Sequence, residues 1–289
     1  MARRRAPRAR RPRDPRARRA GVAHARSRRV TLVSVLGGKG GVGKTNVACN
    51  LAVAAAARGA RVLLVDGDLG LANVDVLLGL VPRGTLADVA AGRARAEEVL
   101  VRGPRGVDVL PAASGRSEMA ALAGEALAPL LGAIVELARG YDVAFVDAAP
   151  GVGAAVVAFA AVSARRIVVA TPEPTSLADA YALLKVMRRD AGAPDADLLV
   201  NAVRHEREAR DTQGRLARLV ARFLDLELRA LGWLPRDARL VEAVALQRAV
   251  VEAFPASAVA RRIGALADTL LEHAAPLRDA QGAAAEARA

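Results

Sequence analysis

The chain has 289 residues, of which 53% are hydrophobic and 2% aromatic, and it carries a formal net charge of +13. No run of bulky apolar residues approaches the roughly 18 that a membrane-spanning helix needs, so we expect no such helix. Cys49 is the sole cysteine, which excludes a disulfide within the chain and fits a protein of the reducing cytoplasm.

Most of the net charge lies in the first 29 residues, which contain thirteen arginines and one acidic residue, whereas residues 30–289 carry a net charge of only +1. A segment so rich in like charges and so poor in bulky apolar residues is predicted to be a disordered tail. Its arginines would attract DNA or an anionic membrane surface, unless they are a compositional bias without function. The remainder suits one large domain, residues 30–275, followed by an alanine-rich tail, residues 276–289.

Residues 38–45 follow the phosphate-loop pattern G-x-x-x-x-G-K-T, and they stand between an apolar run, residues 30–36, and a predicted helix ended by Gly59. The glycines let backbone amides point at one anion, and the helix N-terminus adds a partial positive charge. We expect Lys44 to reach the terminal phosphates of ATP and Thr45 to bind Mg²⁺. The predicted nucleotide contacts here are Gly38, Lys39, Gly40, Gly41, Val42, Gly43, Lys44, Thr45 and Asn46.

The same glycines also fit a dinucleotide-binding fingerprint. Gly38, Gly40 and Gly43 spell G-x-G-x-x-G, and Asp66 follows at a distance typical of that motif. We favour the phosphate loop, because the dinucleotide motif gives no reason for two lysines and a threonine in a chain that has three lysines against forty arginines.

Beyond the loop, short apolar runs alternate with helical patterns. The runs are apolar throughout, which is typical of strands that are covered by helices on both faces. We therefore predict an α/β fold with a doubly wound, mostly parallel sheet and helices on both of its faces. The expected strands after the first are residues 61–66, 107–111, 141–147, 165–171, 197–201 and 228–235.

Two of these runs end in a carboxylate, at the edge where parallel sheets bind ligands. Asp66 and Asp147 are candidates for holding Mg²⁺, and Asp68 for orienting a water molecule near the terminal phosphate. An aspartate at a strand end can also simply cap a turn. The phosphate loop favours the catalytic interpretation of all three.

Three further residues lie at or just beyond the ends of later strands and are assigned to the base of the nucleotide. An asparagine amide can hydrogen bond to a base edge, and a proline ring can pack on a base face, although both residue types also end strands. These candidates are Asn201, Pro235 and Asp237. A basic stretch at residues 204–229 contains seven arginines and is interpreted as a solvated face.

Several of these segments together resemble the MinD/ParA ATPases, from about residue 30 to residue 262. The segments are KGGVGKT with its extra Lys39, DGDLGLANVDVLLGL at 66–80 and TPEPTSLADAYALLK at 171–185. Within that family they are most similar to the FlhG group, also called FleN, which regulates flagellar number and placement. The resemblance implies an ATP-dependent switch with this role, with a ParA-type DNA partition ATPase and a MinD-type division-site regulator as alternatives.

The resemblance also implies roles for individual residues and partners. Two monomers would form a homodimer around two ATP molecules, in which Lys39 reaches the phosphates of the partner while Lys44 and Thr45 serve their own. Asp68 aligns with the family's water-positioning aspartate, and Asp66 and Asp147 with its Mg²⁺ and switch carboxylates. Regulatory partners would be the flagellar GTPase FlhF or a transcriptional regulator.

Two departures from the family pattern concern partners and membrane. The arginine-rich tail lacks the DQAxxLR-like motif with which FlhG proteins stimulate FlhF. MinD-like proteins often end in a basic amphipathic helix that binds the inner face of the membrane reversibly. Here Ile263, Leu266, Leu270 and Leu271 have helical spacing beside Arg261 and Arg262, but residues 276–289 are too small and polar to insert well.

Overall fold

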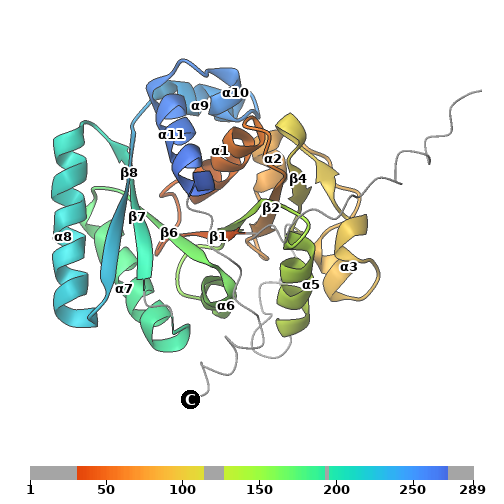
Figure 1. The fold of residues 1–289 in the computed structure, drawn as a ribbon, viewed down its shortest axis with the longest axis horizontal. Coiled ribbons are helices and arrows are strands. Elements are labelled where there is room, and N and C mark those ends of the chain that lie inside the picture. Colours follow the sequence, from red (N-terminus) through yellow and green to blue (C-terminus); the bar gives the residue numbers. More distant parts are fainter. Residues whose placement is uncertain (1–30, 114–126, 193–194, 273–289) are drawn as a thin grey trace, which may run out of the picture.

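The computed structural model describes residues 31–113, 127–192 and 195–272 (Figure 1). The two predicted tails, residues 1–29 and 276–289, lie outside these ranges. Within them, one sheet has the strand order β3-β4-β2-β5-β1-β6-β7-β8. Its strands are β1 (Thr31–Leu36), β2 (Val62–Gly67), β3 (Val101–Arg102), β4 (Asp108–Leu110), β5 (Val143–Ala148), β6 (Arg165–Ala170), β7 (Asp195–Val203) and β8 (Glu227–Pro235).

All neighbouring strands run parallel except β3 and β4, which pair antiparallel. Each strand expected from the sequence is present, so the prediction of a mostly parallel sheet is confirmed. The antiparallel β3 was missed because two residues are too few to produce a hydrophobic pattern. It lies at the edge of the sheet, away from the phosphate loop.

Helices cover both faces of the sheet, as the doubly wound prediction requires (Figure 1). One face packs against α1, α2, α9, α10 and α11, and the other against α3, α5, α6, α7 and α8. The alternation along β1 separates the faces: Val33 and Val35 belong to the first, and Leu32 and Leu36 to the second. The helices are α1 (Lys44–Ala56), α2 (Val74–Leu78), α3 (Leu86–Ala90), α5 (Ala128–Ala138), α6 (Ala154–Val162), α7 (Pro174–Asp190), α8 (Glu206–Leu224), α9 (Ala238–Ala245), α10 (Val250–Ala253) and α11 (Ala258–Glu272).

Helix α11 corrects the suggestion of a membrane-binding helix. Ile263, Leu266 and Leu270 are buried in the same core cluster as α1. The apolar face of α11 is therefore used to close the domain, and it is not available to a bilayer without opening the core. No helix in the described ranges is long and apolar enough to span a membrane.

Candidate functional site

The phosphate loop connects β1 to α1, and its glycines are required by space and by backbone conformation. Gly41 and Gly43 adopt positive φ angles of 78° and 94°, which L-residues with a side chain rarely take. A Cβ on Gly38 would lie 2.0 Å from the carbonyl oxygen of Asp179, and one on Gly43 would lie 2.3 Å from the amide nitrogen of Asn201. The loop is thus held closely between α7 and the end of β7.

Lys44, the first residue of α1, lies over this loop with 7% of its surface exposed. Its Nζ makes a long contact of 3.5 Å with the carbonyl oxygen of Lys39. Burial lowers the pKa of Lys44, whereas the carboxylates of Asp147 and Asp68 raise it. A buried ammonium with such a weak partner is well prepared to bind a phosphate group.

Two buried carboxylates face the loop from neighbouring strands. Asp66 and Asp147 are register partners in β2 and β5, and they are 1% and 2% exposed. Burial, followed by the charge of Asp147, raises the pKa of Asp66 to about 7. Burial also raises the pKa of Asp147 to about 7, although Thr45 and Lys44 oppose the shift. Such a pair is costly without a cation.

The donor set suits Mg²⁺. The Thr45 hydroxyl lies close enough to the Asp147 carboxyl to oppose the rise of its pKa, and Asp147 Oδ1 is buried with no hydrogen-bond partner among the described residues. Those residues contain no group of three or more His, Cys, Asp or Glu side chains that could hold a metal ion by themselves. Mg²⁺ does not require one, because it is commonly held by one or two protein oxygens together with phosphate oxygens and water.

Asp66 and Asp68 also shape the turn after β2. Asp66 accepts hydrogen bonds from the backbone N–H groups of Asp68, Asn73 and Val74 at 3.0 to 3.1 Å. Asp68 Oδ1 accepts from the N–H of Leu71 at 3.0 Å. These bonds fix the carboxylate of Asp68 near Lys44, where its negative charge raises the pKa of the ammonium.

Lys39 points away from its own loop and contacts the start of α7. Its Nζ donates to Glu173 Oε2 at 2.8 Å and to Thr175 Oγ1 at 3.1 Å. The hydrogen bond from Lys39 lowers the pKa of Glu173. This contact could not be predicted from local pattern, because Glu173 and Thr175 lie 134 and 136 residues further along the chain.

Comparison with known proteins identifies the fold and the loop together. Residues 33–250 match the model of the CobQ/CobB/MinD/ParA nucleotide binding domain. The chain belongs to this family. Its predicted phosphate loop is therefore confirmed, and the alternative of a dinucleotide fingerprint is wrong.

Three MinD/ParA family proteins show how far the similarity extends. The antiactivator FleN of Pseudomonas aeruginosa is 47% identical over 228 residues, which are 79% of this chain and 81% of that protein. The flagellum site-determining protein YlxH of Helicobacter pylori is 30% identical over 244 residues, covering 83% and 81%. The structure of the septum site-determining protein MinD of Pyrococcus horikoshii in complex with Mg-ADP has a TM-score of 0.69 and 27% identity, covering 83% and 96%.

The residues assigned to the base have structural contacts that the sequence did not reveal. Asn201 Nδ2 donates to the carbonyl oxygen of Val42 at 2.8 Å, so this side chain of β7 holds the phosphate loop in place. Asp237 Oδ1 caps α9 by accepting from the N–H of Arg239, and its Oδ2 accepts from the N–H of Val259 in α11. Contact of these residues and of Pro235, the last residue of β8, with a base remains a prediction.

Asn46 is the remaining predicted contact. It lies in the first turn of α1, and its Oδ1 is buried with no hydrogen-bond partner among the described residues. Its backbone carbonyl accepts a hydrogen bond from Asn50 Nδ2 at 2.8 Å. An unsatisfied buried acceptor beside Lys44 and Thr45 is consistent with a ligand or a water molecule completing the site.

Proposed function

We propose that the protein is a Mg²⁺-dependent ATPase that forms a homodimer on binding ATP and thereby regulates the number or placement of flagella. The observation that carries the flagellar role is the 47% identity to FleN over most of both chains. The phosphate loop, with Lys44 above it and two buried carboxylates behind it, supports the ATPase activity.

Each part of the site has a task in phosphoryl transfer. The loop amides and Lys44 bind the phosphates and offset the negative charge that develops on the transferring group. Thr45, Asp66 and Asp147 would hold Mg²⁺, which supplies charge neutralisation between the terminal phosphates. Asp68, fixed at the turn after β2, orients the attacking water.

Lys39 connects the site to dimer formation. In this structure it bonds to Glu173 and Thr175 of its own chain, so it must leave them to reach the phosphates of a second copy. The ion pair is solvent-exposed, with side-chain exposures of 30% and 62%, and exposed pairs contribute little. Release of Lys39 is therefore an easy step that a second ATP-loaded monomer could drive.

The same comparison supports a proposal for the regulatory partners. FleN is described as an antiactivator, which favours a transcriptional regulator as a partner of this chain, with the GTPase FlhF as the other candidate. Residues 1–29 would add weak contacts to DNA or to an anionic membrane at its cytoplasmic face.

A ParA-type role in DNA partition is the second candidate, and the thirteen arginines of residues 1–29 favour it. Salt-sensitive DNA binding that requires ATP and survives removal of residues 1–29 would support this role. DNA binding that does not require ATP and is lost when residues 1–29 are removed would indicate only non-specific attraction of DNA to the arginines of that segment. A MinD-type division-site role is the third candidate.

The flagellar role is tested in a strain that lacks the gene. We expect an altered number or position of flagella, restored by the wild-type gene and by Lys185→Ala but not by Lys44→Ala. Lys185 is a matched control because it is an exposed lysine of α7 outside the phosphate loop. Unchanged flagella in the deletion strain would overturn the proposal.

A further inference from the structure

Gln247, in the turn between α9 and α10, combines a strained backbone with a bond toward the nucleotide site. Its φ is 53°, in the left-handed region that residues with a side chain rarely adopt. Its Nε2 donates to the backbone carbonyl oxygen of Val76 in α2 at 3.1 Å. A glycine would take this φ without strain, but it could not reach Val76. Strain of this kind is concentrated at functional and switch segments.

The other end of α2 is held by a carboxylate of the phosphate site. Asp66 Oδ2 accepts from the N–H groups of Asn73 and Val74 at 3.0 and 3.1 Å, and these are the N-cap and the first residue of α2. Because α2 has only five residues, it is about 7.5 Å long, and a displacement of one end reaches the other. Asp66 and Gln247 are therefore connected through little more than one turn of helix.

The helices on either side of Gln247 are tied to the rest of the nucleotide site. Helix α9 begins after Asp237, a candidate base contact that caps this helix. Helix α10 is tied to α1, because the N–H of Val251 donates to Asn50 Oδ1 at 3.2 Å. Asn50 Nδ2 in turn donates to the carbonyl oxygen of Asn46, in the first turn of α1, at 2.8 Å. A movement of α2 that acts on Gln247 thus acts on α9 more than on the anchored α10.

We propose that Gln247 is a positioning residue that couples the Mg²⁺ and phosphate side of the nucleotide site to its base side. When Mg²⁺ and the phosphates are bound, the Asp66 carboxylate adjusts to them, and α2 moves with it. Gln247 transmits this movement to α9 and so to the candidate base contacts before it, Pro235 and Asp237. The inference rests on the proposed Mg²⁺-dependent ATPase. Each side then strengthens binding at the other, because such coupling is reciprocal.

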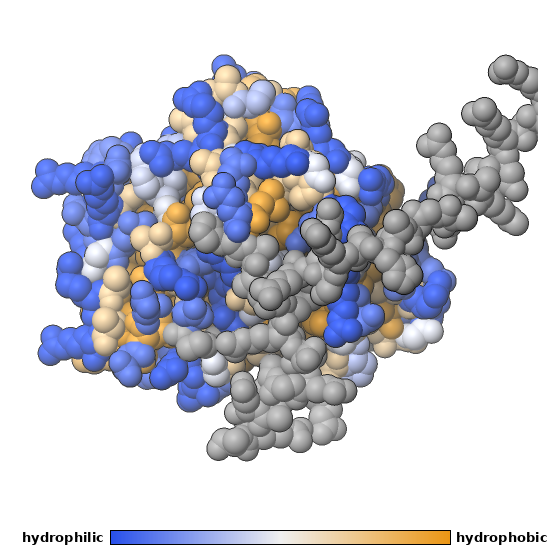
Figure 2. Space-filling view, viewed as in Figure 1, coloured by the Kyte–Doolittle hydropathy of each residue, from blue (hydrophilic) through white to orange (hydrophobic). Residues whose placement is uncertain are grey.

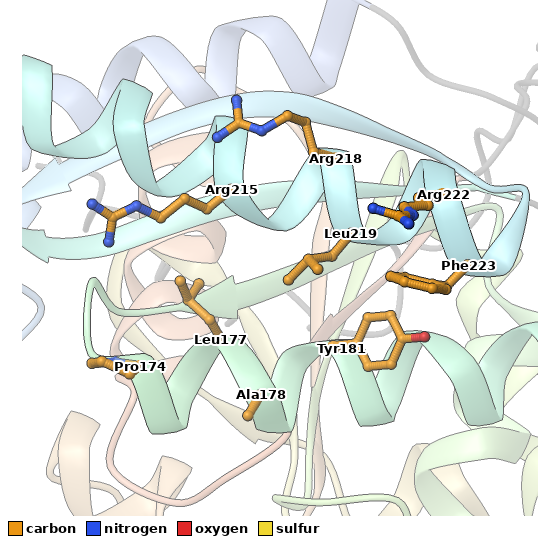
Figure 3. Close-up of a pocket in the computed structure, with 9 residues that line it drawn as sticks. All are labelled: Pro174, Leu177, Ala178, Tyr181, Arg215, Arg218, Leu219, Arg222 and Phe223. Carbon is orange, nitrogen blue, oxygen red and sulfur yellow. The ribbon is translucent and has the colours of Figure 1, made fainter.

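Gln213 offers a matched control. Its Nε2 also donates to a backbone carbonyl oxygen at 3.1 Å, that of Gly232 in β8. Gln213 belongs to α8, which together with α7 lines a groove of 1110 Å³ on the opposite face of the sheet from α1 (Figure 3). In the space-filling view, apolar atoms gather there, at the lower left (Figure 2). The Gln213 bond joins α8 to β8 without reaching α2, so its loss should not change the coupling.

The coupling is measured as the factor by which Mg²⁺ lowers the dissociation constant of a fluorescent ADP analogue. The full-length protein is titrated at saturating Mg²⁺ and again with EDTA, and ADP is used because the dimer is proposed to require ATP. Gln247→Met should reduce the factor at least about threefold, since methionine has a similar length but no N–H donor. Gln247→Gly should do the same, although it relieves the φ. Gln213→Met should leave the factor within about 1.5-fold of the wild type.

Hydrogen exchange provides a readout that does not depend on affinity. Mg-ADP should slow amide exchange in residues 238–253 of the wild type and of Gln213→Met, but not of Gln247→Met. Thermal unfolding checks that each variant is folded.

The outcomes separate this inference from the proposed function. A merely structural role of Gln247 would weaken ADP equally with Mg²⁺ and with EDTA, so an unchanged factor in Gln247→Met overturns the inference and leaves the ATPase intact. A factor lost in Gln247→Met but kept in Gln247→Gly also overturns it, because the bond would then not be the cause. A wild type that binds ADP no more tightly with Mg²⁺ contradicts the Mg²⁺ site itself.

Discussion

The carboxyl edge of the sheet and the α7–α8 groove treat charge in opposite ways. At the edge, Asp66 and Asp147 are almost completely buried, and loop amides, Thr45 and Lys44 surround them. In the groove, Arg215 and Arg218, which line it from α8, are exposed and lie outside any ion pair within the described residues. The groups at the edge are already in place around each other, and only the nucleotide with its Mg²⁺ is missing. The arginines of the groove lie at the surface instead, where water solvates their charge.

The largest expected effect is the loss of ATP turnover when the phosphate site at the carboxyl edge of the sheet is changed. Lys44→Ala removes the buried cation that binds the phosphates, so ATP turnover should fall at least about 100-fold. Lys185→Ala removes an exposed lysine of α7 and should leave turnover within about twofold of the wild type. Both are measured as phosphate release at saturating Mg-ATP. Comparable turnover in the two variants would mean that Lys44 is not at the reacting phosphate.

Replacing a buried and an exposed phenylalanine by alanine should change the free energy of unfolding by different amounts. Phe159 of α6 is fully buried, so Phe159→Ala should lower the free energy of unfolding by about 3–5 kcal/mol. Phe223 is 59% exposed, and Phe223→Ala should lower it by less than about 1 kcal/mol. Urea denaturation of both variants checks this. A large loss from Phe223→Ala would show that the groove is part of the core instead of an open surface.

The buried carboxylates predict a smaller, pH-dependent effect in the protein without Mg²⁺ and nucleotide. Burial raises the folded-state pKa of Asp66 and Asp147 from 3.8 to about 7. Between these values the folded state holds protons that the unfolded chain has released, so the free energy of unfolding decreases as the pH rises through this window. One such proton accounts for at most about 1.4 kcal/mol per pH unit.

Asp147→Asn provides the control for this pH dependence. The variant lacks one titrating carboxyl, so its free energy of unfolding should decrease less steeply than that of the wild type between pH 5.5 and pH 7. Urea denaturation at both pH values measures the two slopes. Equal slopes would mean that Asp147 does not hold a proton in the folded protein at pH 5.5.

The sequence predicted the parts of the molecule that follow from local pattern. The apolar runs gave the strands that position the site, and the glycine and lysine spacing gave the phosphate loop. The contact of Lys39 with Glu173, and the support that Asn201 gives to Val42, join residues more than 130 positions apart. Such pairs depend on how the strands are ordered in the sheet, and a single sequence does not contain that order.

The errors have equally physical reasons. Helix α11 has the amphipathic pattern of a membrane-binding helix, but the same pattern fits a helix that packs on a core, and Ile263 is 1% exposed. The basic stretch at residues 204–229 was interpreted as a solvated face, and the exposed arginines of α8 agree with this. The sequence did not reveal which arginines are in ion pairs: Arg204, just before α8, pairs with Glu208, whereas Arg218 is in no ion pair among the described residues.

The ATP-dependent dimer is tested most directly by measuring molecular mass with light scattering, in ADP and in ATP, for the wild type, Lys39→Ala and Asp68→Ala. We expect Asp68→Ala to remain a stable dimer in ATP, because the dimer forms but hydrolysis does not reset it. Lys39→Ala should stay monomeric, because no lysine crosses to the phosphates of the second copy. A mass that nucleotide leaves unchanged in all three proteins would contradict the switch, even if the loop binds ATP.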